Sequence, residues 1–191
     1  MTGPRAGPHA WVADGDRTDE GSASESMPQN VTAIMPGTFD PVTVGHLDII
    51  RRGACKFGRV VVGIVEVPVR KVPMFDPDER ERFLRESLVG CENVEVDRFN
   101  CLVVEFARRW DAHVILKGLR AISDFEYEFA MAQLNRKLAP DIETVFMMAS
   151  PEHSFLSSSG VKEIAAFGGP VEDLVPPVVA RRLRELYPLR A

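Results

Sequence analysis

Short apolar runs alternate along this chain with longer segments in which apolar residues recur every three or four positions. The runs predict strands at residues 31–35, 60–67, 93–96, 114–116 and 144–148. Helical spacing follows each run, and the last two helices are expected near residues 158–167 and 177–186. Continuous rather than alternating apolarity is typical of strands buried on both faces, as in parallel sheets. Because no hairpin signal interrupts the alternation, the pattern predicts an α/β fold. We expect a doubly wound five-stranded parallel sheet with flanking helices and a C-terminal helix.

Several helix starts carry their own local signals. Asp76 is expected to cap a helix that has Pro77 at its first position. Ser123 and Glu126 have the spacing of a capping box at the start of a long helix. Asn100 is expected to cap a shorter one.

The stretch from Val31 to His46, VTAIMPGTFDPVTVGH, combines a strand, a glycine-containing loop and a helix start. His46 falls in the first helical turn, where unpaired N–H groups and the macrodipole favour an anion. Thr38 follows the strand, at the sheet edge where open α/β sheets bind ligands. Gly45 allows a phosphate to approach the backbone. The alternative is a packing glycine beside a solvated histidine, and the sequence of residues 36–41 directly upstream favours the anion site.

Two further loops at this edge carry cations. Arg70 and Lys71 follow the second strand, where either a solvated loop or a phosphate contact is consistent with the pattern. Lys117 ends the fourth strand, an unfavourable place for a buried cation unless an anion meets it. Gly118 permits close backbone approach, and Arg120 can bind phosphate oxygens through two N–H groups.

The loop after the fifth strand contains three consecutive serines, residues 157–159. At a helix start they supply cap oxygens, hydroxyl donors and free N–H groups, which suits a polyphosphate. An ordinary helix cap is the alternative. The chain has no G-x-x-x-x-G-K-[ST], G-x-G-x-x-G or G-x-S-x-G motif, so P-loop, standard dinucleotide-binding and α/β-hydrolase sites are not expected.

Composition limits the remaining possibilities. The chain has 191 residues, 45% of them hydrophobic and 27% charged, with a net charge of −5. Such an acidic balance argues against non-specific nucleic-acid binding, and no apolar run approaches the roughly 20 residues that cross a membrane. Three scattered cysteines indicate free thiols in a reducing cytoplasm. Residues 1–30, rich in Gly, Pro, Ser and acids, predict a disordered tail, and residues 31–191 a single domain.

Over residues 32–186 the chain resembles the phosphopantetheine adenylyltransferases, bacterial enzymes that make dephospho-coenzyme A from ATP and 4′-phosphopantetheine. The motif PGTFDPVTVGH is shared by the wider nucleotidyltransferase superfamily, whereas KGLRAISDFEYE and HSFLSSSGVKE are more specific. The resemblance implies a Rossmann-like subunit, dependence on Mg²⁺ and a homohexamer, and coenzyme A is a candidate inhibitor. The composition indicates a cytoplasmic location and no nucleic-acid or membrane partner.

The resemblance also assigns roles to residues. Thr38 orients the attacking phosphate, His46 stabilises the transition state, and the cation after the second strand acts beside them, with Lys71 favoured over Arg70. The implied ATP contacts are Thr38, Phe39, His46, Gly118, Leu119, Arg120, Glu128, His153, Ser154, Phe155, Leu156, Ser157, Ser158 and Ser159. The implied phosphopantetheine contacts are Thr38, Arg70, Lys71, Leu102, Val103 and Lys117. No side chain is implied to bind the metal.

Three positions depart from the family pattern. Lys117 stands where arginine is common, and Gly160 replaces a larger apolar residue. The loop over residues 68–74 is one residue longer than usual, which leaves two registers. Counting back from Met74 places the family's lysine on Lys71, and we favour this register because the following Met-Phe pair packs and fixes the end of the loop.

The expected chemistry is in-line attack of the 4′-phosphate on the α-phosphorus of ATP, with pyrophosphate as the leaving group. Two anions must meet, so donors and cations are needed rather than a nucleophilic side chain, and we expect no covalent enzyme intermediate. Another small-molecule nucleotidyltransferase of the superfamily is the nearest alternative. A catalytically silent nucleotide-binding protein and an RNA-binding module are further ones. The silent protein would have lost part of the motif set, and an RNA-binding module fits poorly with the acidic net charge.

Overall fold

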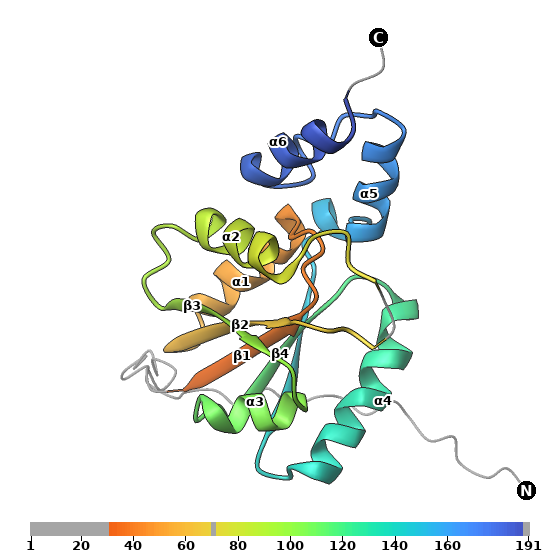
Figure 1. Ribbon diagram of the computed structural model, residues 1–191. Coiled ribbons are helices and arrows are strands. Elements are labelled where there is room, and N and C mark those ends of the chain that lie inside the picture. Colours follow the sequence, from red (N-terminus) through yellow and green to blue (C-terminus); the bar gives the residue numbers. More distant parts are fainter. Residues whose placement is uncertain (1–30, 70–71, 189–191) are drawn as a thin grey trace, which may run out of the picture.

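Five parallel strands form one sheet in the order β3-β2-β1-β4-β5, which confirms the predicted fold class (Figure 1). The computed structural model describes residues 31–69 and 72–188, without the side chains of residues 122 and 123. The tail predicted over residues 1–30 lies outside this range. The strands are β1 Thr32–Gly37, β2 Arg59–Val65, β3 Val94–Phe99, β4 Val114–Leu119 and β5 Glu143–Met148.

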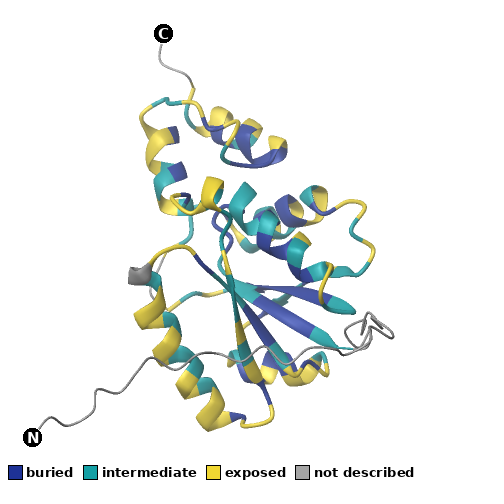
Figure 2. Cartoon of the chain, turned by 180° about the vertical axis from the view of Figure 1, so that it is seen from behind, coloured by how far each residue is buried: buried dark blue, intermediate teal, exposed yellow. Residues whose placement is uncertain are grey.

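Helices cover both faces of the sheet (Figure 1). The helices are α1 Val44–Ala54, α2 Pro77–Ser87, α3 Val103–Arg109, α4 Ile122–Leu138, α5 Ser158–Ala166 and α6 Pro177–Leu186, with a short 3₁₀ turn η1 at Pro151–His153. One core cluster unites α1, α2, α5 and α6 with one face of the strands, and a second unites α3 and the end of α4 with the other face. Between them, β2 and the middle of β1 and β4 are buried, whereas the residues of β5 are all exposed or half-buried (Figure 2).

The order of the strands reverses between β1 and β4, and this is where the sheet opens. β1 pairs with β2 along its whole length, from Thr32 to Gly37. It pairs with β4 at Ala33 and Ile34. Both strands continue beyond these pairs toward their carboxyl ends. Open α/β sheets bind ligands in the crevice at such a switch point.

Three strands extend beyond their predicted carboxyl ends. β1 continues through Pro36 to Gly37, β3 through Arg98 to Phe99, and β4 through Lys117 to Leu119. All three extensions pair with a neighbouring strand, and the apolar pattern of one segment cannot predict such pairing. Lys117 therefore lies within a strand and not at its end.

The predictions of helix caps had mixed outcomes. The Asp76 side chain accepts a hydrogen bond from the N–H of Glu79, which confirms this cap. The capping box predicted at Ser123 is wrong, because α4 already begins at residue 122 after the N-cap Ala121. Asn100 is not the cap of α3 either, since the N-cap is Leu102.

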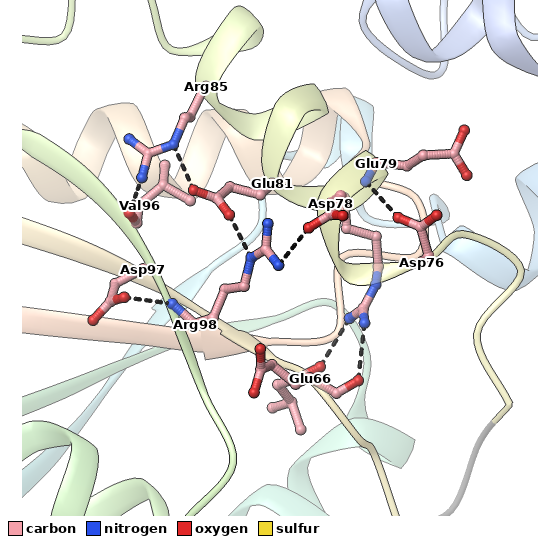
Figure 3. Close-up of polar contacts among 11 residues, drawn as sticks. Glu66, Asp76, Asp78, Glu79, Glu81, Arg85, Val96, Asp97 and Arg98 are labelled. Atoms are coloured by element: carbon pink, nitrogen blue, oxygen red, sulfur yellow. Dashed lines mark hydrogen bonds and ion pairs between the residues drawn. The ribbon is translucent and has the colours of Figure 1, made fainter.

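An ion-pair network joins α2 to the outermost strand β3 (Figure 3). Arg98 pairs with Asp78 at 2.6 Å and with Glu81. Arg85 binds Glu81 at 2.7 Å and donates to the Val96 carbonyl at 2.7 Å. Charged side chains along an edge strand also discourage pairing with another chain. No helix in the described part of the chain is long and apolar enough to span a membrane.

Candidate active site

The loop between β1 and α1 carries the residues that the sequence placed at the centre of the site. Thr38 directly follows β1, at the carboxyl edge where the sheet opens. Phe39 has a positive φ of 50° and is 3% exposed. Its ring meets the His46 ring edge to face, with 5.3 Å between the centroids. A side chain at Gly37 would come within 2.9 Å of the Phe39 ring, so this packing requires glycine.

His46 is held at the start of α1 by a reciprocal capping box with Thr43. The backbone N–H of Thr43 donates to His46 Nδ1 at 3.1 Å, and the Thr43 hydroxyl oxygen accepts from the His46 N–H at 3.3 Å. A backbone N–H has no lone pair to offer, so Nδ1 is the acceptor and the neutral ring carries its proton on Nε2. The Val44 N–H donates to the Leu174 carbonyl at 3.1 Å, which ties the helix start to the segment before α6.

Asp40 connects the β1–α1 loop to two distant segments. Its buried carboxylate accepts from the backbone N–H groups of Met74 and Phe75, at 2.9 Å each. It also receives Lys162 Nζ of α5 at 2.5 Å. The end of the loop after β2 is thereby fixed against the PGTFDP segment. Arg70 and Lys71, within that loop, lie outside the described residues.

Arg80 is the fully buried cation beneath these loops, and the sequence analysis missed it. Its guanidinium donates from Nη1 to the carbonyls of Thr38 and Val65, at 2.9 and 2.8 Å. It donates from Nη2 to Glu66 at 3.0 Å and from Nε to Phe75 at 3.1 Å. Burial lowers the pKa of Arg80 from its ordinary value, and the negative charge of Asp40 opposes this effect. No local pattern marks an arginine in α2 as buried.

Lys117 and Glu128 were assigned to different substrates, and the structure brings them together. Their side chains form an ion pair at 3.2 Å and are 26% and 20% exposed. The pair lies between β4 and α4. Gly118 beside it packs closely on α1, since a Cβ there would lie 3.2 Å from Ile49.

Arg120 joins the β4–α4 loop to the serine segment. Its guanidinium binds both carboxylate oxygens of Asp124, at 3.0 and 3.2 Å, and donates to the Leu156 carbonyl at 2.7 Å. Arg120 thereby positions Leu156, and the sequence analysis predicted both residues to contact ATP. The side chain of Leu119, which precedes Arg120, is buried.

The segment from His153 to Ser159 lies beside the start of α1. A Cβ at Gly45 would lie 3.4 Å from the Cβ of His153. Ser157 is the N-cap of α5 and accepts from the Gly160 N–H at 3.0 Å, as an ordinary cap does. Ser158 donates to the Pro41 carbonyl at 2.8 Å. The outward-facing members are Ser154, Phe155 and Ser159, all exposed.

A second network that the sequence analysis missed anchors the chain just before this segment. The Ser150 hydroxyl donates to Asp48 of α1 at 2.8 Å, and Arg52 bridges Asp48 and the Met148 carbonyl at 3.0 and 2.8 Å. Slight burial alone would raise the pKa of Asp48, but the hydrogen bonds from Ser150 and Arg52 outweigh it, so the pKa lies below its ordinary value. The carboxylate therefore stays charged and holds the segment at neutral pH.

Leu102 and Val103 lie at the start of α3, after β3. They are at the carboxyl edge of the sheet but two strands away from β1. Leu102 is exposed, and Val103 is half-buried against the second core cluster. They follow a strand that is separated from β4, the strand of Lys117, by β2 and β1.

Cations, hydroxyls and helix starts thus lie on the loops after β1, β4 and β5, at the carboxyl edge of the sheet beside the switch point. Such a site can hold two phosphate-bearing ligands and offers donors to a charge that develops between them. Within the described residues, no group of three or more His, Cys, Asp or Glu side chains is placed to hold a metal ion.

Comparisons with known proteins show which family this chain is similar to. A family model described as cytidylyltransferase-like matches residues 34–164. A phosphopantetheine adenylyltransferase of Gloeobacter violaceus is 55% identical over 155 residues, which cover 81% of this chain and 96% of that protein. One of Caldanaerobacter subterraneus subsp. tengcongensis is 52% identical with the same coverage. Among solved structures, the nicotinic acid mononucleotide adenylyltransferase of Plasmodium falciparum complexed with NaAD matches with a TM-score of 0.63. It is 12% identical and covers 83% of this chain and 96% of its own, a likeness of fold.

Proposed function

The chain belongs to the phosphopantetheine adenylyltransferase family, and we propose that it transfers the adenylyl group of ATP to 4′-phosphopantetheine. The products are dephospho-coenzyme A and pyrophosphate, and the reaction belongs to coenzyme A biosynthesis. The observation that carries the proposal is that the loops after β1, β4 and β5 come together beside the switch point, through the Arg120–Leu156 hydrogen bond and the packing of Gly45 on His153. These loops carry Thr38, His46 and the serine segment, and Lys117 lies near the end of β4. Relatives at about half sequence identity over nearly their whole length bear the same name.

In this reaction an oxygen of the 4′-phosphate forms a bond to the α-phosphorus of ATP while the bond from that phosphorus to the bridging oxygen of pyrophosphate breaks. The chain's residues position the two anions and offset their charge. The Thr38 hydroxyl orients the attacking phosphate. His46 donates its Nε2–H to the α-phosphate, as its fixed tautomer allows. No side chain forms a covalent intermediate.

Lys117 supplies a cation for the acceptor phosphate, and Glu128 holds that cation in place before the substrate arrives. Lysine here offers a point charge where an arginine would offer a rigid fork. The second cation comes from the loop after β2, for which we favour Lys71 over Arg70. Leu102 and Val103 provide apolar surface for the pantetheine arm.

We propose that Mg²⁺ enters the site on the triphosphate of ATP. Magnesium usually keeps several waters and binds substrate phosphates with one or two carboxylates. The described residues do not form a metal site by themselves, and Asp40 is engaged by two backbone N–H groups and Lys162. When bound, the ion offsets the negative charge of the leaving pyrophosphate. Activity should depend on free Mg²⁺ and vanish with a chelator.

We propose that the chain assembles as a homohexamer, and helix α4 supports this. Much of this helix is exposed (Figure 2), and its apolar side chains are not confined to one face. The exposed fractions lie between 45 and 56% for Phe125, Tyr127, Phe129, Leu134 and Leu138. So much exposed apolar surface on one helix marks an interaction site. Sedimentation equilibrium should give six chains per particle, and Leu134→Lys should shift the particle to smaller species.

Two further proposals concern inhibition by coenzyme A and the cellular location of the protein. Coenzyme A contains both the pantetheine and the adenosine halves of the product, so we expect it to compete with the substrates and inhibit. The protein is expected to work in the cytoplasm, where its three free cysteines stay reduced.

The deciding experiment is pyrophosphate release from ATP and 4′-phosphopantetheine in the presence of Mg²⁺. A panel that exchanges ATP for CTP, and phosphopantetheine for nicotinamide mononucleotide, separates the proposal from the other nucleotidyltransferases of the superfamily. The proposal fails if another pair of substrates is turned over faster. A protein that binds ATP but releases no pyrophosphate with any acceptor would instead be a silent nucleotide-binding protein.

A further inference from the structure

We propose that Arg80 is a positioning residue for adenylyl transfer, which fixes the Thr38–Phe39 peptide so that the Phe39 N–H faces the phosphates of ATP. The inference rests on the proposed function. It concerns a residue that contacts no substrate and acts through the backbone. The argument starts from the hydrogen bond between Arg80 Nη1 and the Thr38 carbonyl, at 2.9 Å.

A trans peptide unit is planar, and its C=O and N–H bonds point in opposite directions. The Thr38 carbonyl points at the buried guanidinium of Arg80. The N–H of Phe39, which belongs to the same peptide unit, therefore points away from Arg80. Since Arg80 lies beneath the carboxyl ends of β1 and β2, the opposite direction leads toward the ligand edge. A backbone N–H held in this way is the kind of donor that stabilises developing charge on a phosphate.

The backbone at Phe39 needs such support. Its φ of 50° lies in the left-handed region, which is unfavourable for a residue with a Cβ. Two features hold it there. The Phe39 ring is buried against Gly37 and His46, and the preceding carbonyl is bound by Arg80. Without the guanidinium, the Thr38–Phe39 peptide could rotate and relieve this strain.

Only a guanidinium suits the position. Arg80 satisfies the carbonyls of Thr38, Val65, Glu66 and Phe75, which come from the loop after β1 and from both ends of the loop after β2. An ammonium has three donors around one point, whereas arginine has five in a fixed plane. Arg80 thus sets the distance between Thr38 and the loop that carries the second cation. Its buried charge also lies beneath the place where two anions meet.

The test compares Arg80→Lys and Arg80→Met with controls of similar stability. Ile142 is 2% exposed in the second core cluster and precedes β5 at the opposite end of that strand. Ile142→Val and Ile142→Ala should therefore lower the melting temperature without touching the site. We expect both Arg80 variants to lose about 10²-fold in kcat, as for other backbone-type donors. The Kd of ATP should change little, and both Ile142 variants should keep their kcat.

Two readouts report on the Phe39 N–H itself. ATP with sulfur in place of one α-phosphate oxygen has two diastereomers, and a fixed donor discriminates between them. The Arg80 variants should lose this preference, so that the ratio of the two rates moves toward one. The chain has 11 phenylalanines, so ¹⁵N-phenylalanine labelling gives few amide signals, and Phe39→Leu assigns the relevant one. ATP should shift this signal in the wild type and leave it in place in Arg80→Met.

The inference is overturned if Arg80→Met or Arg80→Lys keeps the diastereomer preference and the ATP-induced shift of the Phe39 amide. It is equally overturned if the Ile142 variants lose kcat to the same extent at matched melting temperature. If Arg80→Met does not fold, Arg80→Lys decides alone. A wild-type protein without pyrophosphate release would defeat the proposed function, whereas the response of the Phe39 amide to ATP still tests the role of Arg80.

Discussion

Replacement of His46 by alanine should remove one transition-state contact while leaving the fold and ATP binding almost intact. In the structure Nδ1 accepts from the Thr43 N–H, so Nε2 is the donor to the α-phosphate. Loss of one preorganised donor of this kind costs about 10²–10³ in kcat, or about 2.7–4 kcal/mol. The hydrogen bond from the Thr43 N–H to Nδ1 is lost as well, at about 1 kcal/mol of stability, while the Thr43 hydroxyl still accepts from the backbone N–H at position 46. This is small against the roughly 5–15 kcal/mol that holds a domain folded.

Two further variants distinguish the role of His46 in capping α1 from its role in turnover. Asparagine at position 46 reaches the place of Nδ1 and keeps a polar partner for Thr43, but it has no group at the place of Nε2. Glutamine reaches the place of Nε2 and can donate there. His46→Asn should therefore be as slow as His46→Ala but more stable, and His46→Gln should recover part of the turnover. His113→Ala, at an exposed histidine far from the site, serves as the control.

The assay is pyrophosphate release at saturating ATP and phosphopantetheine, with the Kd of ATP from calorimetry and the melting temperature of each variant. A contact made only in the transition state lowers kcat and leaves the Kd of ATP near its wild-type value. The reasoning is refuted if His46→Ala loses ATP affinity while turnover at saturation survives, or if His46→Asn turns over like the wild type.

Three more outcomes are expected. Lys71→Ala should reduce turnover with phosphopantetheine far more than Arg70→Ala, and both should bind ATP; steady-state kinetics that show the reverse would transfer the role to Arg70. Removal of residues 1–30 should leave activity, melting temperature and particle size nearly unchanged, since the tail has little apolar surface to dock, and a large drop in any of them contradicts this. Glu81 has a pKa below its ordinary value of 4.5, because its hydrogen bonds with Arg85 and Arg98 outweigh its desolvation. A lowered carboxyl pKa stabilises the fold above the ordinary value and loses this effect as the pH falls through the folded value. The stability difference between wild type and Glu81→Gln in urea unfolding should therefore be constant near neutral pH and shrink below pH 4.5; a constant difference down to pH 3 would contradict the shift.

Local patterns were sufficient for the order of the elements and for the strand, loop and helix start that carry Thr38 and His46. Strand and helix periodicity arises within a few residues, so the five strands and the final helix at Pro177–Leu186 could be read from the chain. Thr38 and His46 belong to one strand, loop and helix start. Their relation is therefore set by short-range geometry.

Local rules failed where another strand decides the conformation. Ser123 and Glu126 have the spacing of a capping box, yet α4 begins earlier, at residue 122. Pairing with β5 extends β4 to Leu119, and the Ala149 N–H donates to its carbonyl at 2.8 Å, so the helix must start directly afterwards. Pairing with β5 thus fixed the start of α4, which the capping pattern of the local sequence had placed after Ser123.

The sequence alone determined which groups could meet a phosphate, and the tertiary structure decided what holds them. Arg80 binds the Thr38 carbonyl 42 residues away, and Asp40 meets Lys162 across 122 residues. No periodicity or motif encodes such pairs. A buried guanidinium becomes favourable only when several strand ends turn their carbonyls toward one point, and that point exists only in the folded sheet.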